Sequence, residues 1–137
     1  MIFEKIIPTD SQIEQLSSLL INRNYSISHK NLPTKKEHKE FVSNNPYVAW
    51  YLIYEDTNLL GSVYVNTDNS IGISLNHPKI EEVLESIKYI KENHLPLPPI
   101  KSLRRGDFFI NIASDDLNMI KILKKLNKQK IQLSYLI

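Results

Sequence analysis

Histidine is the residue type in this chain best suited to moving a proton near neutral pH, and His29, His38, His77 and His94 are present. His29 lies in a polar segment between two predicted helices, where a neutral imidazole could accept a proton from an ammonium group. A histidine that braces this segment through backbone hydrogen bonds is the alternative. His38 follows a glutamate on a predicted helix, which favours packing or a surface position. No pair of the four histidines has the close spacing of metal ligands and there is no cysteine, so the sequence predicts no metal site.

Aromatic side chains gather on two predicted neighbouring strands. A phenol such as that of Tyr64 can donate a hydrogen bond to a developing oxyanion or act as an acid. Aromatic pairs also stabilise sheets by cross-strand packing, so packing is the alternative for the whole group. Its members are Trp50, Tyr51, Tyr54 and Tyr64.

Basic residues precede one predicted strand and surround the last predicted helix. Lys101, Arg104 and Arg105 could contact a phosphate, an anionic sugar nucleotide or a nucleic acid. The lysines near the last helix fit a solvated helix face, with cations placed favourably at its C-terminus. They are Lys121, Lys124, Lys125, Lys128 and Lys130.

Four helices are predicted from helical periodicity and capping residues. The first begins at a cap formed by Thr9, Asp10 or Ser11 and ends at 22–24. The second begins with a capping box formed by Thr34 and Glu37. The third covers residues 78–93, with a stripe of Ile80, Val83, Leu84, Ile87 and Ile90. The fourth follows 114–116, with Ile120, Leu123 and Leu126 on its apolar face.

Strands are predicted at 1–7, 47–55, 59–65, 70–75, 108–112 and 130–137, from their aromatic and β-branched residues. Gly61 and Gly72 within strands predict a close backbone approach or a bulge. The order β-α-α-β-β-β-α-β-α-β predicts an α/β (α+β) fold, a mixed sheet flanked by helices in a single domain over 1–137. A ligand can enter such a sheet where its antiparallel part meets its parallel part.

Composition limits the function classes. The chain has 137 residues, a net charge of +2, 42% hydrophobic residues and no cysteine, which excludes a disulfide scaffold and a thiolate nucleophile. No apolar run approaches the ~18 residues of a membrane span, and the start lacks a signal-peptide pattern, so we expect a cytoplasmic protein without membrane partners. The charge is too small and too mixed to indicate nucleic-acid binding.

Short motifs along nearly the whole chain carry a resemblance to a known family. They include SISHK (26–30), LPT (32–34), EH (37–38), PY (46–47), WY (50–51), GS (61–62), NSIGI (69–73), NI (111–112), IQ (131–132) and SY (134–135). These words and the element order resemble a bacterial branch of the GNAT superfamily of acyl-coenzyme-A-dependent N-acyltransferases. The resemblance implies the GNAT fold, with acetyl-CoA or another acyl-CoA as co-substrate.

The resemblance also assigns roles to residues. It implies that the backbone of Ile73–Leu75 holds the pantetheine arm and that His29 and Tyr64 act as base and acid. The implied cofactor-binding residues are Ile73, Ser74, Leu75, Asn76, Lys79, Arg105 and Asp116. The implied substrate-binding residues are Ser28, His29, Lys30 and Trp50.

Departures from the family pattern affect the coenzyme site. The glycine-rich turn that holds the coenzyme pyrophosphate is replaced by residues 76–82 (NHPKIEE), which contain no glycine. Pro78 donates no N–H, and Glu81 and Glu82 occupy the positions that the helix dipole offers to an anion. Leu123 stands where the family often has an acidic tyrosine, Asn127-Lys128 replaces Gly-Phe, and Ser70 and Asp116 replace a family glutamate and asparagine.

Two functions follow from the resemblance and its departures. The first is an N-acyltransferase that moves an acyl group, acetyl in the simplest case, from acyl-CoA to a small-molecule amine such as an amino sugar. The second is a catalytically degenerate GNAT fold that binds a ligand or a protein. A homodimer could form through a sheet edge or the final strand.

Overall fold

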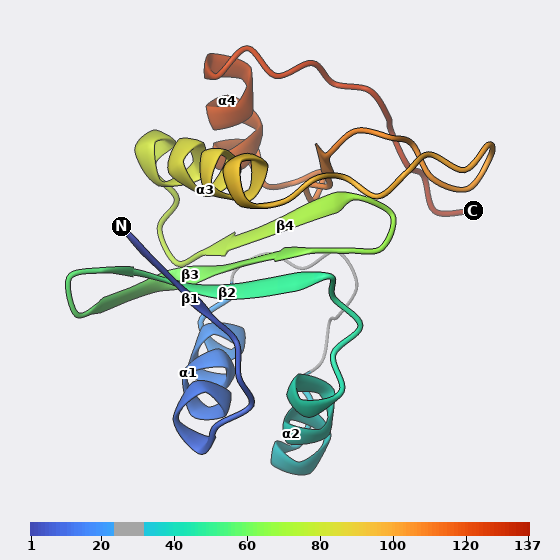
Figure 1. The fold of residues 1–137 in the computed structure, drawn as a ribbon. Helices are drawn as coiled ribbons and strands as arrows, with labels where there is room; N and C mark the ends of the chain where they lie inside the picture. The colour runs from blue at the N-terminus through green and yellow to red at the C-terminus, as the bar shows by residue number, and fades with distance from the viewer. Residues whose placement is uncertain (24–31) are drawn as a thin grey trace.

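A computed structural model of the chain describes residues 1–23 and 32–137. Within these residues a five-stranded sheet runs in the order β1-β2-β3-β4-β5 (Figure 1). The strands are β1 (Ile2–Lys5), β2 (Ala49–Glu55), β3 (Asn58–Val65), β4 (Ser70–Leu75) and β5 (Phe109–Ile110). The first three pairings are antiparallel and the β4–β5 pairing is parallel. The chain therefore has the predicted mixed sheet with helices on both faces.

The helices lie in two pairs, one on each face of the sheet (Figure 1). One pair is α1 (Asp10–Ile21) with α2 (Lys35–Ser43), and the other is α3 (Ile80–Asn93) with α4 (Leu117–Lys125). The predicted caps are present: the Thr9 side chain accepts the N–H of Gln12, and Thr34 and Glu37 form the capping box. Such caps satisfy backbone donors that the first helical turn leaves free.

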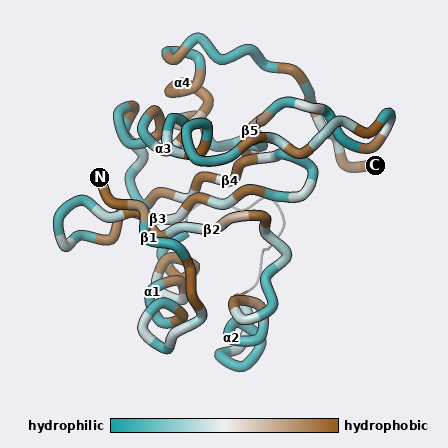
Figure 2. The backbone as a smooth tube through the Cα atoms, viewed as in Figure 1, coloured by the Kyte–Doolittle hydropathy of each residue, from teal (hydrophilic) through white to brown (hydrophobic). Residues whose placement is uncertain are grey.

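Alternation along the strands divides the core between the two faces. Trp50 and Leu52 of β2 pack with Leu16, Leu19 and Val42 of α1 and α2. On the opposite face a second set packs together with Ile90 of α3, and Figure 2 shows hydrophobic residues along β4. This set is Ala49, Tyr51, Ile53, Val63, Val65, Ile71 and Ile90. β2 is thus buried on both faces, which explains its nearly continuous apolar sequence.

Two predicted helix positions need correction. Leu84 is 44% exposed and Ile120 is 39% exposed, whereas Met119 and Ile122 are the buried residues of α4. α4 presents Met119 and Ile122, with the half-buried Leu123 and Leu126, to α3. Leu123 and Leu126 therefore pack as predicted, whereas Met119 and Ile122 take the buried positions and Ile120 lies exposed.

The predicted strand at 130–137 is wrong, and the strand predicted at 108–112 is shorter than expected. No strand forms over residues 130–137, where Leu133 is 65% exposed and Tyr135 is 79% exposed. β5 contains only Phe109 and Ile110. A strand is stabilised by backbone hydrogen bonds to a neighbouring strand. Its sequence indicates only a propensity for the extended conformation and does not show that such a neighbour is present.

The glycines in β3 and β4 lie at close approaches, as their positions predict. The register between β2 and β3 shifts beside Gly61, and a Cβ there would collide with the carbonyl oxygen of Ser74. A Cβ on Gly72 would collide with the ring of Tyr64. Both glycines therefore allow the sheet to close tightly around β4.

A tyrosine–histidine pair joins the end of α3 to the sheet. The Nε2 atom of His94 lies 2.8 Å from the hydroxyl oxygen of Tyr51. Burial, and then the nearby charge of Lys5, lower the pKa of His94 from 6.5. The folded protein therefore favours the neutral imidazole.

We predict that the free energy of unfolding falls as the pH decreases below about 6.5. The unfolded state, with the higher histidine pKa, binds the proton first, so this contribution is complete above that pH and is lost as the pH approaches the lowered pKa. Urea unfolding between pH 5 and 8 (about the range in which histidine titrates) measures the change. His94→Gln should flatten the profile and His77→Gln, at an exposed position, should not; equal flattening by both would contradict the assignment.

Candidate functional site

The pairing between β4 and β5 stops after two residues. Ser70 is aligned with Phe109 and Ile71 with Ile110. β4 then continues to Leu75, where it still pairs with Gly61 of β3. Among the described residues, β4 therefore has no strand partner on its other edge beyond Ile71.

Strand alternation identifies which backbone groups face this open edge. Asn66 donates its N–H to the carbonyl of Ser70 (2.9 Å), and Asn76 donates its N–H to the carbonyl of Leu60 (3.0 Å). Even-numbered residues of β4 thus form the hydrogen-bonded pairs with β3. It follows that the N–H and C=O groups of Ile73 and Leu75 face away from β3.

A cleft of ≈ 460 Å³ lies along this end of β4, a volume within the usual range for small-molecule sites. Three parts of the chain line it: the end of α1, the end of β4 with the turn that follows, and the start of α4. The lining residues are Leu19, Asn22, Arg23, Ile73, Ser74, Leu75, Asn76, His77, Pro78, Lys79, Asp116, Asn118 and Met119. All the predicted cofactor-binding residues except Arg105 therefore meet at one cleft.

The N-terminus of α3 is occupied by its own carboxylate. Glu82 is 8% exposed, and its Oε2 atom accepts the N–H of Lys79 at 3.2 Å. Asn118 of α4 donates to the carbonyl of Pro78 (3.2 Å), which ties the turn before α3 to α4. The prediction that Glu82 takes the anion position of this helix is confirmed.

The N-terminus of α4 also carries an acidic cap. The Oδ1 atom of Asp116 accepts the N–H of Met119 at 3.2 Å. Glu82 and Asp116 thus place negative charge near the cleft, while Lys79 and Arg23 contribute cations to its lining. This charge distribution suits a neutral ligand arm beside β4 better than a phosphate at either helix.

Tyr64 packs beside the cleft and is not among its lining residues. Its ring stacks on Tyr47 with centroids 4.2 Å apart and covers Gly72. Burial raises the pKa of Tyr64, and the nearby Arg23 charge opposes the change; burial raises the pKa of Tyr47 to about 12. Both phenols stay protonated at neutral pH, so Tyr64 can donate a proton.

Arg23 is the residue of this region that the sequence did not single out. It follows α1, lines the cleft and acts electrostatically on Tyr47 and Tyr64. No motif surrounds Arg23. The one signal that could have identified it as a site residue is its position just after the end of α1.

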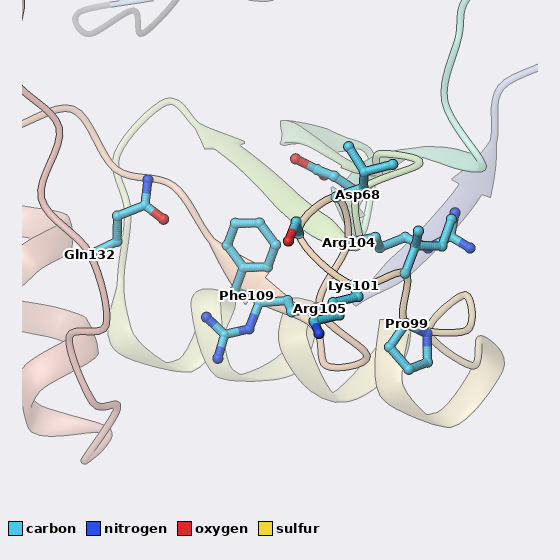
Figure 3. Close-up of a pocket in the computed structure, with 10 residues that line it drawn as sticks. Asp68, Pro99, Lys101, Arg104, Arg105, Phe109 and Gln132 are labelled. Atoms are coloured by element: carbon cyan, nitrogen blue, oxygen red, sulfur yellow. The ribbon is translucent and has the colours of Figure 1, made fainter.

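The remaining predicted residues lie apart from the cleft. Trp50 is 9% exposed and packs edge-on against Tyr47 at 5.0 Å, in agreement with the packing interpretation. Arg105 lies at a second hollow, beside Phe109 (Figure 3). The predicted base His29 and its neighbours Ser28 and Lys30 lie outside the described residues.

His38 has a structural position. It is 6% exposed, and its Nε2 atom lies 3.0 Å from the carbonyl oxygen of Ile13. The pair connects α2 to α1, so the packing interpretation of this histidine is confirmed. In the part of the chain that the structure covers, no group of three or more histidine, cysteine or acidic residues could hold a metal ion.

Comparisons with known proteins add no family assignment. No family model matches the chain, and no curated protein matches it significantly. Across residues 1–23 and 32–137, no helix is long and apolar enough to cross a membrane. The observations that bear on function are therefore the open edge of β4 and the cleft beside it.

The contact between Gly72 and Tyr64 can be tested with a double-mutant cycle. Gly72→Ala should destabilise the protein by about 1–3 kcal/mol, because the new methyl group displaces the tyrosine ring. In a Tyr64→Ala background the same change should cost less than about 1 kcal/mol, since the space is then free. Urea denaturation measures all four free energies of unfolding, and an equal cost in both backgrounds would show that the ring does not cover Gly72.

Proposed function

We propose that this chain is an acyl-coenzyme-A-dependent N-acyltransferase of the GNAT type, which acts on a small-molecule amine. The supporting observation is the edge of β4 that has no strand partner beyond Ile71 within residues 1–23 and 32–137, where Ile73 and Leu75 direct backbone groups toward the cleft. Like groups along a strand edge repeat at about 6.6–6.8 Å. An extended arm with two amides, such as pantetheine, can bind there as an added strand does.

The coenzyme fits this cleft only in part. The pantetheine arm matches the free edge of β4, whereas Glu82 fills the helix terminus that would otherwise receive a diphosphate. We infer that Lys79 and Arg23, which both line the cleft, contact the phosphates instead. Their side chains provide charge without the glycine turn that the family uses.

The proposed chemistry is direct transfer. A bound acyl-CoA supplies a thioester carbonyl that the amine nitrogen attacks, so that a C–N bond forms and the C–S bond breaks. The Ile73 or Leu75 N–H donates to the developing oxyanion, and Tyr64 or water donates a proton to the departing sulfur. Removal of the amine proton by His29 remains a prediction from the sequence.

The second candidate is a binding protein that has lost the transfer reaction. The acidic caps Glu82 and Asp116 favour it, because both disfavour a polyanionic coenzyme at the cleft. Release of free thiol from acetyl-CoA in the presence of small amines separates the two candidates. Turnover supports the transferase, and the absence of turnover with every member of a broad panel of amines supports the binding protein.

We predict that acetyl-CoA binds the wild-type protein with micromolar or better affinity and raises its melting temperature. Ser74→Phe should abolish both effects, because Ser74 lines the cleft and a phenyl ring fills it. Thr57→Phe, in the exposed β2–β3 turn, is the matched control and should bind normally. Absence of heat in a calorimetric titration of wild type at millimolar acetyl-CoA would refute the proposed function.

The charge of Glu82 provides a second prediction. Glu82→Gln keeps an oxygen that can accept the Lys79 N–H and removes a negative charge that lies near the cleft. Acetyl-CoA should therefore bind about twofold to fivefold more tightly, the range expected for a charge at a helix terminus. Glu85→Gln on the exposed side of α3 makes the same net change and should have little effect, and weaker binding by Glu82→Gln alone would contradict this account.

A further inference from the structure

The segment between α3 and β5 is fixed by a buried asparagine. Asn69 is fully buried and has a left-handed φ of 72°. Its Nδ2 atom donates to the carbonyls of Leu97 (2.9 Å) and Arg105 (2.8 Å), and its Oδ1 atom accepts the N–H of Leu97 (2.7 Å). Both ends of the loop 97–105 are therefore held at one point of the β3–β4 turn.

The interior of the loop is braced by one of its own arginines. Arg104 donates from Nε to the carbonyl of Pro98 (2.7 Å) and from Nη1 to the carbonyl of Thr67 (3.3 Å). Ile100 and Arg104 exchange two backbone hydrogen bonds of 2.8 Å. The Arg104 side chain therefore fixes the loop. Lys101 and Arg105 extend from this fixed backbone.

A hollow of ≈ 450 Å³ lies against this loop (Figure 3). Lys101 and Arg105 line it with exposed side chains, and the Cζ atom of Arg105 lies 5.8 Å from the ring centroid of Phe109. Asp68, the acidic residue of the lining, already accepts hydrogen bonds from the N–H (2.8 Å) and hydroxyl (2.6 Å) of Ser70. The hollow thus combines an aromatic face with the cations of Lys101 and Arg105, and Arg104, whose side chain braces the loop, also lines it.

The hollow and the coenzyme cleft lie at opposite ends of β4. Asp68, just before β4, and Phe109, aligned with the first residue of β4, line the hollow. Ile73–Asn76, at the other end, line the cleft. Because side chains alternate along a strand, Ser70, Gly72 and Ser74 share one face, and the register places Phe109 on that face.

We propose that the hollow binds a phosphate group of the acyl acceptor, so that the acceptor is a phosphorylated amine. The Arg105 guanidinium can grip two phosphate oxygens, and the Lys101 ammonium adds a point charge. Phe109 offers a face for a sugar ring or a base. The assignment of this phosphate to an acyl acceptor rests on the proposed function. The phosphate site itself does not depend on coenzyme binding.

Calorimetric titration with inorganic pyrophosphate tests the phosphate site. Lys101→Gln/Arg105→Gln should weaken wild-type binding at least tenfold, and added salt should weaken it further. Lys39→Gln/Lys88→Gln, on exposed positions of α2 and α3, makes the same charge change and should bind within twofold of wild type. Equal affinity in the two double variants, or no binding by wild type at millimolar pyrophosphate, would overturn the site.

Acetyl-CoA titrations separate this site from the coenzyme cleft. Lys101→Gln/Arg105→Gln should bind acetyl-CoA within twofold of wild type, because neither residue lines the cleft. A tenfold loss would assign Arg105 to the coenzyme phosphate, as the family resemblance implies, and would overturn the proposal. If wild type binds pyrophosphate at these residues but no acetyl-CoA, the proposed function fails while the phosphate site remains.

Turnover assays then identify the phosphorylated group. Glucosamine, glucosamine 6-phosphate and a uridine-diphosphate amino sugar distinguish a neutral acceptor, a phosphomonoester and a diphosphate. At least one phosphorylated amine should exceed glucosamine by tenfold in kcat/KM, and Lys101→Gln/Arg105→Gln should remove that preference. Equal use of glucosamine and both phosphorylated amines would contradict the assignment of the hollow to the acceptor.

Discussion

A backbone N–H or C=O group that is removed from water needs a partner, and among the described residues only one edge of β4 has a strand partner along its whole length. β3 satisfies the even-numbered residues along the full length of β4, while β5 covers the other edge at Ser70 and Ile71 alone. The unpaired groups of Ile73 and Leu75 are thus the constraint on which the site depends. A ligand that supplies the missing acceptors and donors completes the sheet.

Apolar packing explains why β5 leaves β4 so early. Ile110 and Ile112 pack with Val83 and Ile87 of α3 and with the buried face of α4. Burying these side chains offsets the loss of further ladder hydrogen bonds, since each removes apolar surface from water at roughly 25 cal/mol per Å². The helices on this face therefore hold the edge of β4 open.

The two ends of β4 differ in the charge around them, and we propose that they bind different parts of the reactants. At the end of the strand, Glu82 and Asp116 cap the two helices whose N-termini adjoin the cleft. At its start, Lys101 and Arg105 project from a rigid loop, and the Arg105 guanidinium lies over Phe109. A neutral arm beside Ile73 and a phosphate beside Arg105 would each meet suitable surroundings.

Interactions between residues close in the sequence could be predicted from it. Contacts between distant segments were harder to predict. The capping box at Thr34 and Glu37 and the charge at Glu82 follow from spacing alone, and both are confirmed. The strand predicted at 130–137 does not form, because the types of residue in a segment carry no information about a partner strand. Arg105 lies apart from the other cofactor candidates because Asn69, for which no motif predicted this role, fixes the loop 97–105 at the opposite end of β4.

The free edge of β4 can be observed directly by residue-resolved amide hydrogen exchange in solution, with and without acetyl-CoA. Without ligand, the amides of Ile73 and Leu75 should exchange much faster than those of Gly72 and Ser74, which form the pairs with β3. Saturating acetyl-CoA should slow Ile73 and Leu75 selectively. Equal protection of all four amides in the free protein would mean that the strand edge is already paired, and the account of the site would be wrong.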